Sequence, residues 1–475
     1  MHSPVLPIAS HPSSGKPRRS VYVWGIAIVA ALGGLLFGYD WVVIGGARQF
    51  YEVYFHLTSP AVVGWANSCA LVGCLFGSLA AGTFADRYGR RRILLSAAVL
   101  FAISSVLTGW AWSFTDFIFW RVFGGVAIGL SSNVSPLYIA EISPAAQRGR
   151  LVSLNQFAIV VGILVAQIVN WRIARPVPAG MPTELMFLTW NVRYGWRWMF
   201  TAVTAPALVF TFASIFIPES PRWLTSIGRA REARAILERI GGPEYASAEI
   251  DSIESALGAD STVTQSSWRE LFFPRFRKIL LVGIALAALQ QWTGINILFN
   301  YAAEVYRSAG YGANEIFLNI VITGAINLAF TILAMALVDR IGRRLLMLCG
   351  CVGIGVSHLL CAWAYLAQWQ GKVVLILTLS AIACYALTIA PVTWVLIAEI
   401  FPRRIRSKGV STAVSALWIA SFLLTYTFPF LIRLEGAAGV FINYGIICIF
   451  GFVFVAFSVS ETKGRTLEQI DAGLT

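Results

Sequence analysis

Charged residues are scarce in this sequence. They make up 12% of its 475 residues, whereas hydrophobic residues make up 57%, and this balance argues against a soluble protein of this length. Histidines are few as well, because only four are scattered along the chain, and the sequence has no phosphate-binding loop and no cluster of metal ligands. It therefore predicts that the protein is neither an enzyme nor an ATP-driven pump, and that it has no cofactor and no metal site.

Long apolar runs recur along the whole chain and predict membrane-spanning helices, which need roughly 20 apolar residues each. Continuous runs, rather than alternation at every second residue, favour helices over a barrel. We expect about twelve spans, six on each side of one long polar passage. The predicted ranges are 21–47, 60–84, 93–113, 115–140, 150–171, 195–217, 278–303, 313–337, 343–368, 372–398, 408–432 and 437–458.

The net charge of +13 would suggest a nucleic-acid partner in a soluble protein, but here it indicates topology. Most Lys and Arg residues fall at the N-terminus or in the even-numbered loops, so we expect these loops and both termini to be cytoplasmic. The lipid bilayer is the expected partner, and nucleic acid is not. All seven cysteines lie inside predicted spans, which leaves no disulfide framework.

The polar passage 218–277 separates the two groups of spans. Its charges alternate with Ile and Leu, and Ala233, Ile236, Leu237 and Ile240 would share one face of an amphipathic helix. We therefore expect a helical platform rather than a flexible linker. The predicted order is a disordered cytoplasmic tail (1–20), a six-helix bundle (21–217), the platform (218–277), a second six-helix bundle (278–458) and a cytoplasmic C-terminal tail (459–475).

Charged motifs recur in the two halves in the same order. In each pair the first half is given before the second: DRYGRR at 86–91 and DRIGRR at 339–344, YIAE at 138–141 and LIAE at 396–399, PESPR at 218–222 and SETKGR at 460–465. This order predicts a duplication of parallel six-helix units, an architecture of many secondary transporters.

On these motifs the chain resembles the sugar porters of the major facilitator superfamily, from about residue 21 to residue 470. It shares with them GLLFGYD at 34–40 and QQWTGIN at 290–296, and it is similar to the bacterial proton-coupled xylose carrier and the animal glucose facilitators. The resemblance implies an all-α membrane protein that imports a monosaccharide together with a proton by alternating access. We expect it to act as a monomer in a bacterial inner membrane.

The repeated acidic and basic residues predict a cytoplasmic gate. Arg offers a planar fork that binds a carboxylate through two bonds, and such pairs between adjacent helices can hold a gate closed. The family pattern implies a cluster in each half, joined by residues of the platform: Asp86, Arg90, Arg91, Glu141 and Arg148, then Asp339, Arg343, Arg344, Glu399 and Arg406, with Glu219 and Arg222. The alternative, charges that only set topology, explains the arginines but not the repeated carboxylates.

Asp40 and Arg121 are the clearest ionisable residues inside predicted spans. Asp40 lies roughly 28 Å along the first span, and Arg121 roughly 9 Å below the outer end of the fourth. Both therefore fall at a comparable depth, where a charge is costly unless it is paired or functional. Arg121 would hold Asp40 ionised, and loss of that contact would let Asp40 take a proton. Proton symporters of the family keep Asp here; a static ion pair is the alternative.

A sugar site needs amides, which donate and accept hydrogen bonds, and aromatic rings against the C–H faces of the sugar. Gln290 and Gln291 lie near the middle of the seventh span, and Asn296 follows about one and a half turns later. By the family match, the predicted sugar-binding residues are Gln156, Gln290, Gln291, Asn296, Asn327, Trp394 and Trp418. Each amide alone could instead make an interhelical hydrogen bond.

Some positions depart from the family pattern and bear on the substrate. Asn300 stands where the family has a gate Tyr, and Leu417 where it has an amide. Ala390 replaces Gly, Val203 replaces a Glu of the xylose carrier, and Ser460 replaces Pro. We expect these differences to alter the preferred sugar and not the class of protein. The alternatives are a uniporter, a proton-coupled carrier of a polyol or inositol, and a sugar sensor, which would need a longer signalling tail.

Overall fold

The structure is a computed structural model, and it describes residues 20–178, 181–262, 268–369, 371–402, 405–459 and 461. The predicted tails, 1–20 and 459–475, lie outside this part apart from Ser20, Val459 and Glu461. The described chain is helical in the following order: α1 (Ser20–Tyr54), α2 (Pro60–Tyr88), α3 (Arg90–Gly109), α4 (Phe114–Ile142), α5 (Arg148–Ile173), α6 (Thr183–Met186), η1 (Asn191–Gly195), α7 (Trp196–Thr201), α8 (Thr204–Phe216), α9 (Pro221–Ser226), α10 (Ala230–Gly241), α11 (Pro243–Thr262), η2 (Trp268–Phe272), α12 (Pro274–Trp292), α13 (Ile295–Asn300), α14 (Ala302–Ser308), α15 (Ala313–Ile341), α16 (Arg343–Leu366), α17 (Lys372–Leu387), α18 (Ile389–Ile400) and α19 (Arg406–Ser458).

Eleven helical segments of the described chain are long and apolar enough to cross a membrane. The last of them, Lys408–Ser458, has 51 residues and is interrupted at Gly436. The φ of Gly436 is +67°, a left-handed conformation that glycine adopts without the steric cost of a Cβ. This segment therefore makes two crossings, and with the other ten it gives twelve. The prediction of an all-α membrane protein with about twelve spans is confirmed.

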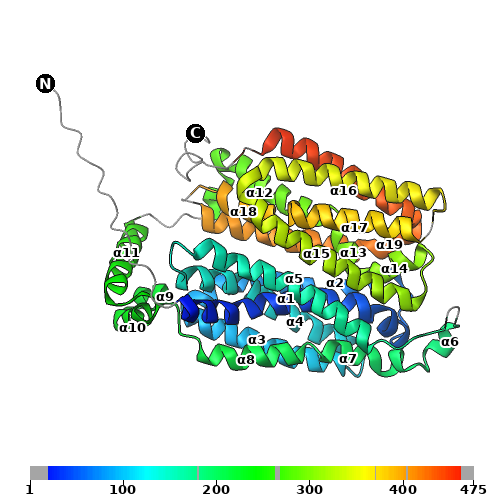
Figure 1. The fold of residues 1–475 in the computed structure, drawn as a ribbon, viewed down its shortest axis with the longest axis horizontal. Helices are drawn as coiled ribbons and strands as arrows, with labels where there is room; N and C mark the ends of the chain where they lie inside the picture. Colours follow the sequence, from blue (N-terminus) through cyan, green and yellow to red (C-terminus); the bar gives the residue numbers. More distant parts are fainter. Residues whose placement is uncertain are drawn as a thin grey trace.

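Two bundles and a projecting platform make up the molecule (Figure 1). Helices α1 to α8 form the lower bundle in this view, α12 to α19 form the upper one, and α9 to α11 project from one end. We call this the platform end, and the opposite end, which carries α6 and α14, the far end. In α10 the predicted apolar face is buried at Ala233, Leu237 and Ile240, so the expected helical platform is confirmed.

Two spans are broken in ways that the sequence explains. The seventh span consists of α12 and α13, which are separated at Thr293 and Gly294, and Gly294 has a φ of +83°. The tenth span consists of α17 and α18, which meet at Thr388. Pro391 causes this second break, because it has no N–H to donate to the carbonyl of Leu387. Broken spans leave main-chain groups available inside a bundle.

Glycines let neighbouring helices of the first half approach closely. A Cβ on Gly38 of α1 would lie 1.9 Å from the carbonyl oxygen of Ile159 of α5, and one on Gly125 of α4 would lie 1.9 Å from that of Ala70 of α2. Small residues at such contacts are typical of helix packing in membranes. The two halves meet where α2 packs on α19 and α5 packs on α15. Helices α1 and α4, which also contact each other, carry the charged pair described next.

Candidate functional site

A buried ion pair joins α1 to α4. Arg121 Nη1 donates to both carboxylate oxygens of Asp40, at 2.9 and 3.0 Å, and each residue is only 4% exposed. A pair this deeply buried is stable only while both charges are compensated. The Nε of Arg121 has no hydrogen-bond partner among the described residues. The structure thus brings the two predicted residues together and leaves one guanidinium donor for another group.

Aromatic side chains link this pair to the second half. Phe37 and Trp41 stand on either side of Asp40 in α1, and their rings lie 5.9 and 6.1 Å from that of Trp418 in α19. Trp418 is buried, and its Nε1 has no partner among the described residues. Trp418 was predicted from the sequence, whereas Phe37 and Trp41 were not. Their spacing of four residues, which places both on one helix face, is the signal that could have found them.

A chain of amide hydrogen bonds follows the break in the seventh span. Gln290 Nε2 donates to the hydroxyl of Tyr385 at 3.0 Å, Gln291 Nε2 donates to Gln290 Oε1 at 2.6 Å, and Asn296 Nδ2 donates to Gln291 Oε1. All four side chains are buried. The structure therefore joins three predicted residues and adds Tyr385, which no motif in the sequence marks.

His358 of α16 supports the same break, although sequence analysis gave it no role. Its Nε2 donates to the carbonyl oxygen of Thr293 at 2.8 Å, a group at the point where the helical ladder is interrupted. Its ring packs against Phe441 and Tyr444. The ring of Tyr444 in turn fills the space beside Gly294, where a Cβ would lie 2.5 Å from it. These contacts stabilise the break at Thr293 and Gly294, and the break sets how the amide side chains on either side of it are oriented.

The three other predicted sugar residues lie on separate helices. Gln156 is on α5, Asn327 on α15 and Trp394 on α18. Asn327 is buried, whereas Gln156 and Trp394 are half-buried. In the described part of the chain no hydrogen bond joins them to the amide chain. Their role in binding stays a prediction, although α5 and α15 are neighbours across the interface between the halves.

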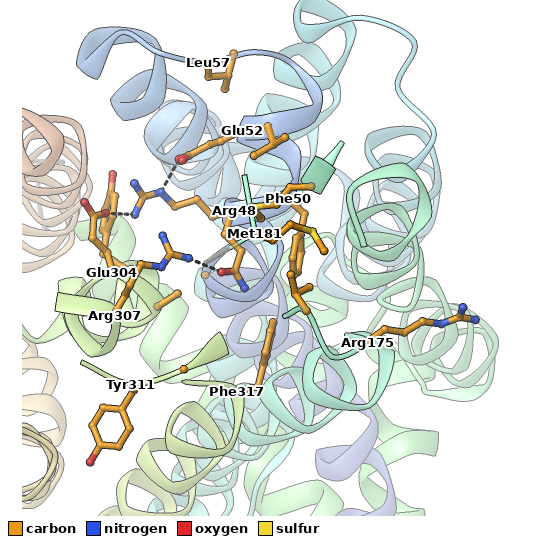
Figure 2. A pocket seen from close by; sticks show the side chains of 18 of the residues that line it. Arg48, Phe50, Glu52, Leu57, Arg175, Met181, Glu304, Arg307, Tyr311 and Phe317 are labelled. Carbon is orange, nitrogen blue, oxygen red and sulfur yellow. Dashed lines mark hydrogen bonds and ion pairs between the residues drawn. The ribbon is translucent and has the colours of Figure 1, made fainter. Parts of the chain in front are cut away.

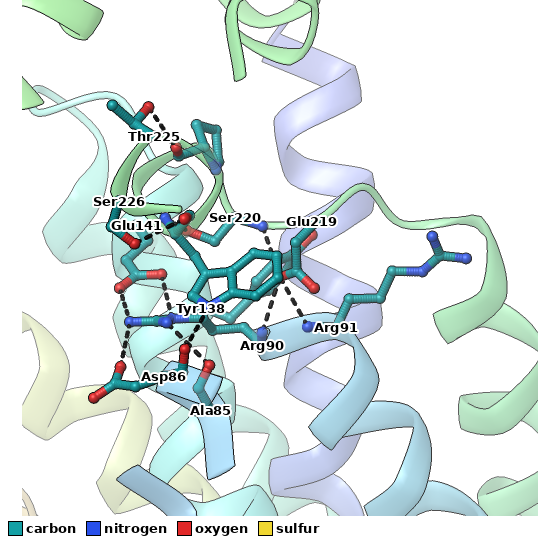
Figure 3. A network of polar contacts seen from close by, with 12 residues as sticks. Ala85, Asp86, Arg90, Arg91, Tyr138, Glu141, Glu219, Ser220, Thr225 and Ser226 are labelled. Carbon is teal, nitrogen blue, oxygen red and sulfur yellow. Dashed lines mark hydrogen bonds and ion pairs between the residues drawn. The ribbon is translucent and has the colours of Figure 1, made fainter. Parts of the chain in front are cut away.

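The first predicted gate cluster gathers at the platform end (Figure 3). Arg90 Nε lies 2.9 Å from a carboxylate oxygen of Glu141, and its Nη2 lies 3.1 Å from one of Asp86. Glu219 accepts hydrogen bonds from the main-chain N–H groups of Arg90 and Arg91, at 2.9 and 3.1 Å. It therefore compensates the partial positive charge at the start of α3 rather than pairing with an arginine side chain.

The second half repeats this arrangement. Arg343 Nη2 lies 3.5 Å from a carboxylate oxygen of Glu399. Glu461 accepts hydrogen bonds from the main-chain N–H groups of Arg343 and Arg344, at 3.0 and 3.1 Å. Glu219 binds the start of α3 in the same way. Glu461 belongs to the repeated motif SETKGR but was not among the predicted gate residues. The side chain of Asp339 lies outside what the structure describes.

Arg91 and Arg344 differ from the expectation that they pair with carboxylates. The side chain of Arg91 donates to the carbonyl oxygens of Ser214, at 3.3 Å, and Ile215, near the end of α8. Arg344 Nη2 donates to the carbonyl oxygen of Ala456 at 2.5 Å, near the end of α19. The last carbonyls of a helix lack partners within it and attract cations. Each arginine thus ties the DRYGRR or DRIGRR motif to the end of the last span of its own half.

Arg148 and Arg406 differ from the expectation in the same way. Arg148 Nε donates to the carbonyl oxygen of Ala140 at 3.1 Å, near the end of α4, and Arg406 Nε donates to that of Phe401 at 2.9 Å, just after α18. Each holds the turn that follows its YIAE or LIAE motif. Arg222, the remaining predicted gate residue, is exposed in α9.

Polar contacts across the two halves close the far end. Arg48 of α1 lies 2.5 Å from Glu52 and 2.6 Å from Glu304 of α14. Arg307 of α14 donates to Gln49 Oε1 of α1 at 2.7 Å. Figure 2 shows Arg48, Glu304 and Arg307 at a cavity of about 670 Å³, which Gln49 also lines. The predicted first span ends at residue 47, whereas α1 continues beyond it as a regular helix, so the sequence did not mark these contacts.

Known proteins are similar to this chain over nearly its full length. The sequence matches the family described as "Sugar (and other) transporter" over residues 26–474. It is 36% identical to the D-xylose-proton symporter of Escherichia coli K12, over 96% of each protein. It is 34% identical to the arabinose-proton symporter of Bacillus subtilis, over 98% of this chain and 97% of that protein. The fold is similar to the Escherichia coli xylose transporter in a partially occluded inward-open conformation, with a TM-score of 0.83, 34% identity, and coverage of 94% of this chain and 100% of the other.

Proposed function

Because the chain belongs to the family of sugar (and other) transporters, we propose that it imports a monosaccharide together with a proton by alternating access. The observation that carries this proposal is the buried ion pair of Asp40 and Arg121. Next to Asp40 in α1, Trp41 contacts Trp418 of the second half. Two relatives of high coverage are proton symporters for D-xylose and arabinose. The proposed role is that of a carrier and not of an enzyme.

Asp40 is the proposed proton-binding group. While Arg121 lies against it, the ionised carboxylate is compensated; when the pair separates, a buried carboxylate favours the protonated form. Protonation would remove one charge and release the guanidinium, so that binding of a proton and rearrangement of α1 against α4 become linked. A carboxylate with this single strong cationic partner suits a reversible proton site.

The proposed sugar site is built around the amide chain of the seventh span. Gln290, Gln291 and Asn296 offer donors and acceptors at one level of the bundle, and these hydrogen bonds can be exchanged for sugar hydroxyls. Trp418 adds an aromatic face and a buried Nε1–H that has no partner in the described chain. Gln156, Asn327 and Trp394 complete the proposed site.

The proposed orientation places the platform end and both termini in the cytoplasm, in a bacterial inner membrane, with the monomer as the functional unit. The far end then faces outward, and the contacts of Arg48 and Arg307 with the opposite half close the outward path. The clusters around Arg90 and Arg343 form the proposed cytoplasmic gate.

Uptake into proteoliposomes tests proton coupling. With an inward proton gradient, we expect labelled D-xylose or L-arabinose to reach a higher concentration inside than outside, and a protonophore to abolish the excess. Uptake that stops at equal concentrations with or without the gradient would establish a uniporter instead. Competition by unlabelled D-glucose, D-galactose, xylitol and myo-inositol in the same vesicles identifies the preferred substrate and tests the polyol alternative.

Breaking the far-end contact is expected to open that end. In Glu304→Gln, Arg48 loses a charged partner, and a charge-assisted hydrogen bond of this kind contributes about 1.5–3 kcal/mol. The population open at the far end should rise roughly ten- to hundredfold. Spin labels at Leu188→Cys and Leu434→Cys, both exposed at the far end, report the separation once Cys349, the exposed native thiol, is replaced by Ser.

The matched control for this measurement is Glu232→Gln, which breaks the exposed pair of Arg229 and Glu232 on α10. Exposed pairs contribute little to stability, so the label distances should stay at the parent's values. If Glu304→Gln also leaves the distances unchanged, the ion pair does not hold the far end closed.

A further inference from the structure

A small cavity lies beside Asp40 and Arg121, where the two halves meet. Helices α1, α2 and α4 of the first half line it, and α13 of the second half contributes Asn300. Its volume is about 20 Å³, and a water molecule requires about 10–15 Å³. The cavity therefore has room for one water molecule and not for a sugar.

The polar atoms around this cavity suit a water molecule. Asn300 is 5% exposed and its Oδ1, an acceptor, has no partner among the described residues; the Nε of Arg121, a donor, has none either. Asn67 also lines the cavity, but it is already bonded to Tyr51 and Val63. A water can accept from Arg121 Nε–H, donate to Asn300 Oδ1 and donate to a carboxylate oxygen of Asp40, which gives it three partners.

Contact between α1 and α13 holds Asn300 at this position. Five residues beyond Asp40, a Cβ on Gly45 would lie 2.5 Å from the carbonyl oxygen of Phe299 and 3.4 Å from the Cα of Asn300. Helix α1 therefore touches the backbone of α13 directly. The far-end contact of Arg48 with Glu304 joins α1 to α14, the helix that directly follows α13. An opening motion that separates α1 from α13 would withdraw Asn300 from the cavity.

We propose that Asn300 is a coupling residue that binds one water molecule with Arg121 and Asp40, and so links the proton site to closure of the far end. This inference rests on the proposed proton symport and names a residue through which it is regulated. Hydrogen bonds to a carboxylate favour its ionised form. The bridge therefore favours a deprotonated Asp40 when the far end is closed, and ionised Asp40 equally favours closure, because such linkage is reciprocal.

The variant Asn300→Leu tests this inference, since leucine is similar in size but cannot bind the water. Coupling energies between sites correspond to about 5- to 150-fold effects. We expect the accumulation ratio of labelled sugar under a proton gradient to fall about fivefold or more. The number of protons entering per sugar, read from a pH dye inside the vesicles, should fall with it, while sugar exchange at equal pH falls by less than the accumulation ratio does.

Two further variants accompany the test. Asn300→Ser keeps an oxygen in the cavity, leaves room for a second water, and is expected to restore most of the accumulation. Asn319→Leu changes another buried asparagine of the second half whose Nδ2 has no described partner and which does not line this cavity. It should accumulate sugar like the parent.

The outcomes separate the two proposals. A parent protein that never accumulates sugar overturns the proposed symport itself. A parent that accumulates sugar, with Asn300→Leu equal to it, overturns the coupling role alone. Equal loss of exchange and accumulation in Asn300→Leu, without recovery in Asn300→Ser, also overturns it, because the residue would then serve the sugar site or the fold.

Discussion

Replacing Asp40 by Asn is expected to abolish uphill accumulation of sugar and to leave sugar exchange between the two sides. The amide has the shape of the protonated carboxyl group but cannot release a proton, so the carrier can still change conformation with sugar bound. Under a fixed proton gradient, the internal sugar should settle at the external concentration. The measurement is the accumulation ratio in proteoliposomes, with counterflow of labelled sugar as the readout of exchange.

Stability must be separated from coupling in this variant. Asp40→Asn leaves Arg121 buried without its counterion, which can cost about 3–5 kcal/mol. The double variant Asp40→Asn with Arg121→Gln removes both charges, so its melting temperature should recover toward that of the parent while accumulation stays absent. If the double variant concentrates sugar like the parent, the pair is a static element of the fold and the proton binds elsewhere.

Replacing Gln290 or Asn296 by Ala is expected to weaken sugar binding strongly. Each amide lost leaves a buried hydroxyl or amide without a partner, at about 1–3 kcal/mol, which corresponds to a loss of affinity of roughly ten- to hundredfold. Calorimetric titration of the purified protein with the preferred sugar measures this directly. Trp418→Phe is a narrower change, because it keeps an aromatic ring and removes only the Nε1–H donor.

The control for binding is Ser308→Ala. Ser308 lies at the end of α14 and bonds to the carbonyl oxygen of Val305, so its loss should leave affinity at the parent's value. Equal affinities in Gln290→Ala, Asn296→Ala and the parent would place the sugar site away from the seventh span. Affinity lost together with the melting temperature would instead indicate that the amides serve the fold.

The sequence alone predicted those features that depend on local periodicity. Rise per residue placed Asp40 and Arg121 at one depth, and the structure has them in contact. The apolar face of α10 followed from spacing along one helix. Both inferences use distances within a helix, which its regular geometry determines.

Contacts between distant helices were much harder to predict. Arg48 and Glu304 are 256 residues apart, and no local pattern brings them together. The arginines at 91, 148, 344 and 406 were predicted to bind carboxylates, but a main-chain carbonyl also accepts from a guanidinium, and unpaired carbonyls are present at every helix end. Sequence identifies the donor in such cases; the partner depends on which helix end lies within reach in the fold.

The glutamates at 219 and 461 have a consequence for the motion of the two bundles. Each binds main-chain N–H groups at the start of a helix in its own half, α3 for Glu219 and α16 for Glu461. The entrance to α9 therefore moves with the first bundle, and the end of α19 moves with the second. Helix α10 contacts α1, and α11 contacts α9, so the platform moves as part of the first bundle rather than as a loose connection between the two.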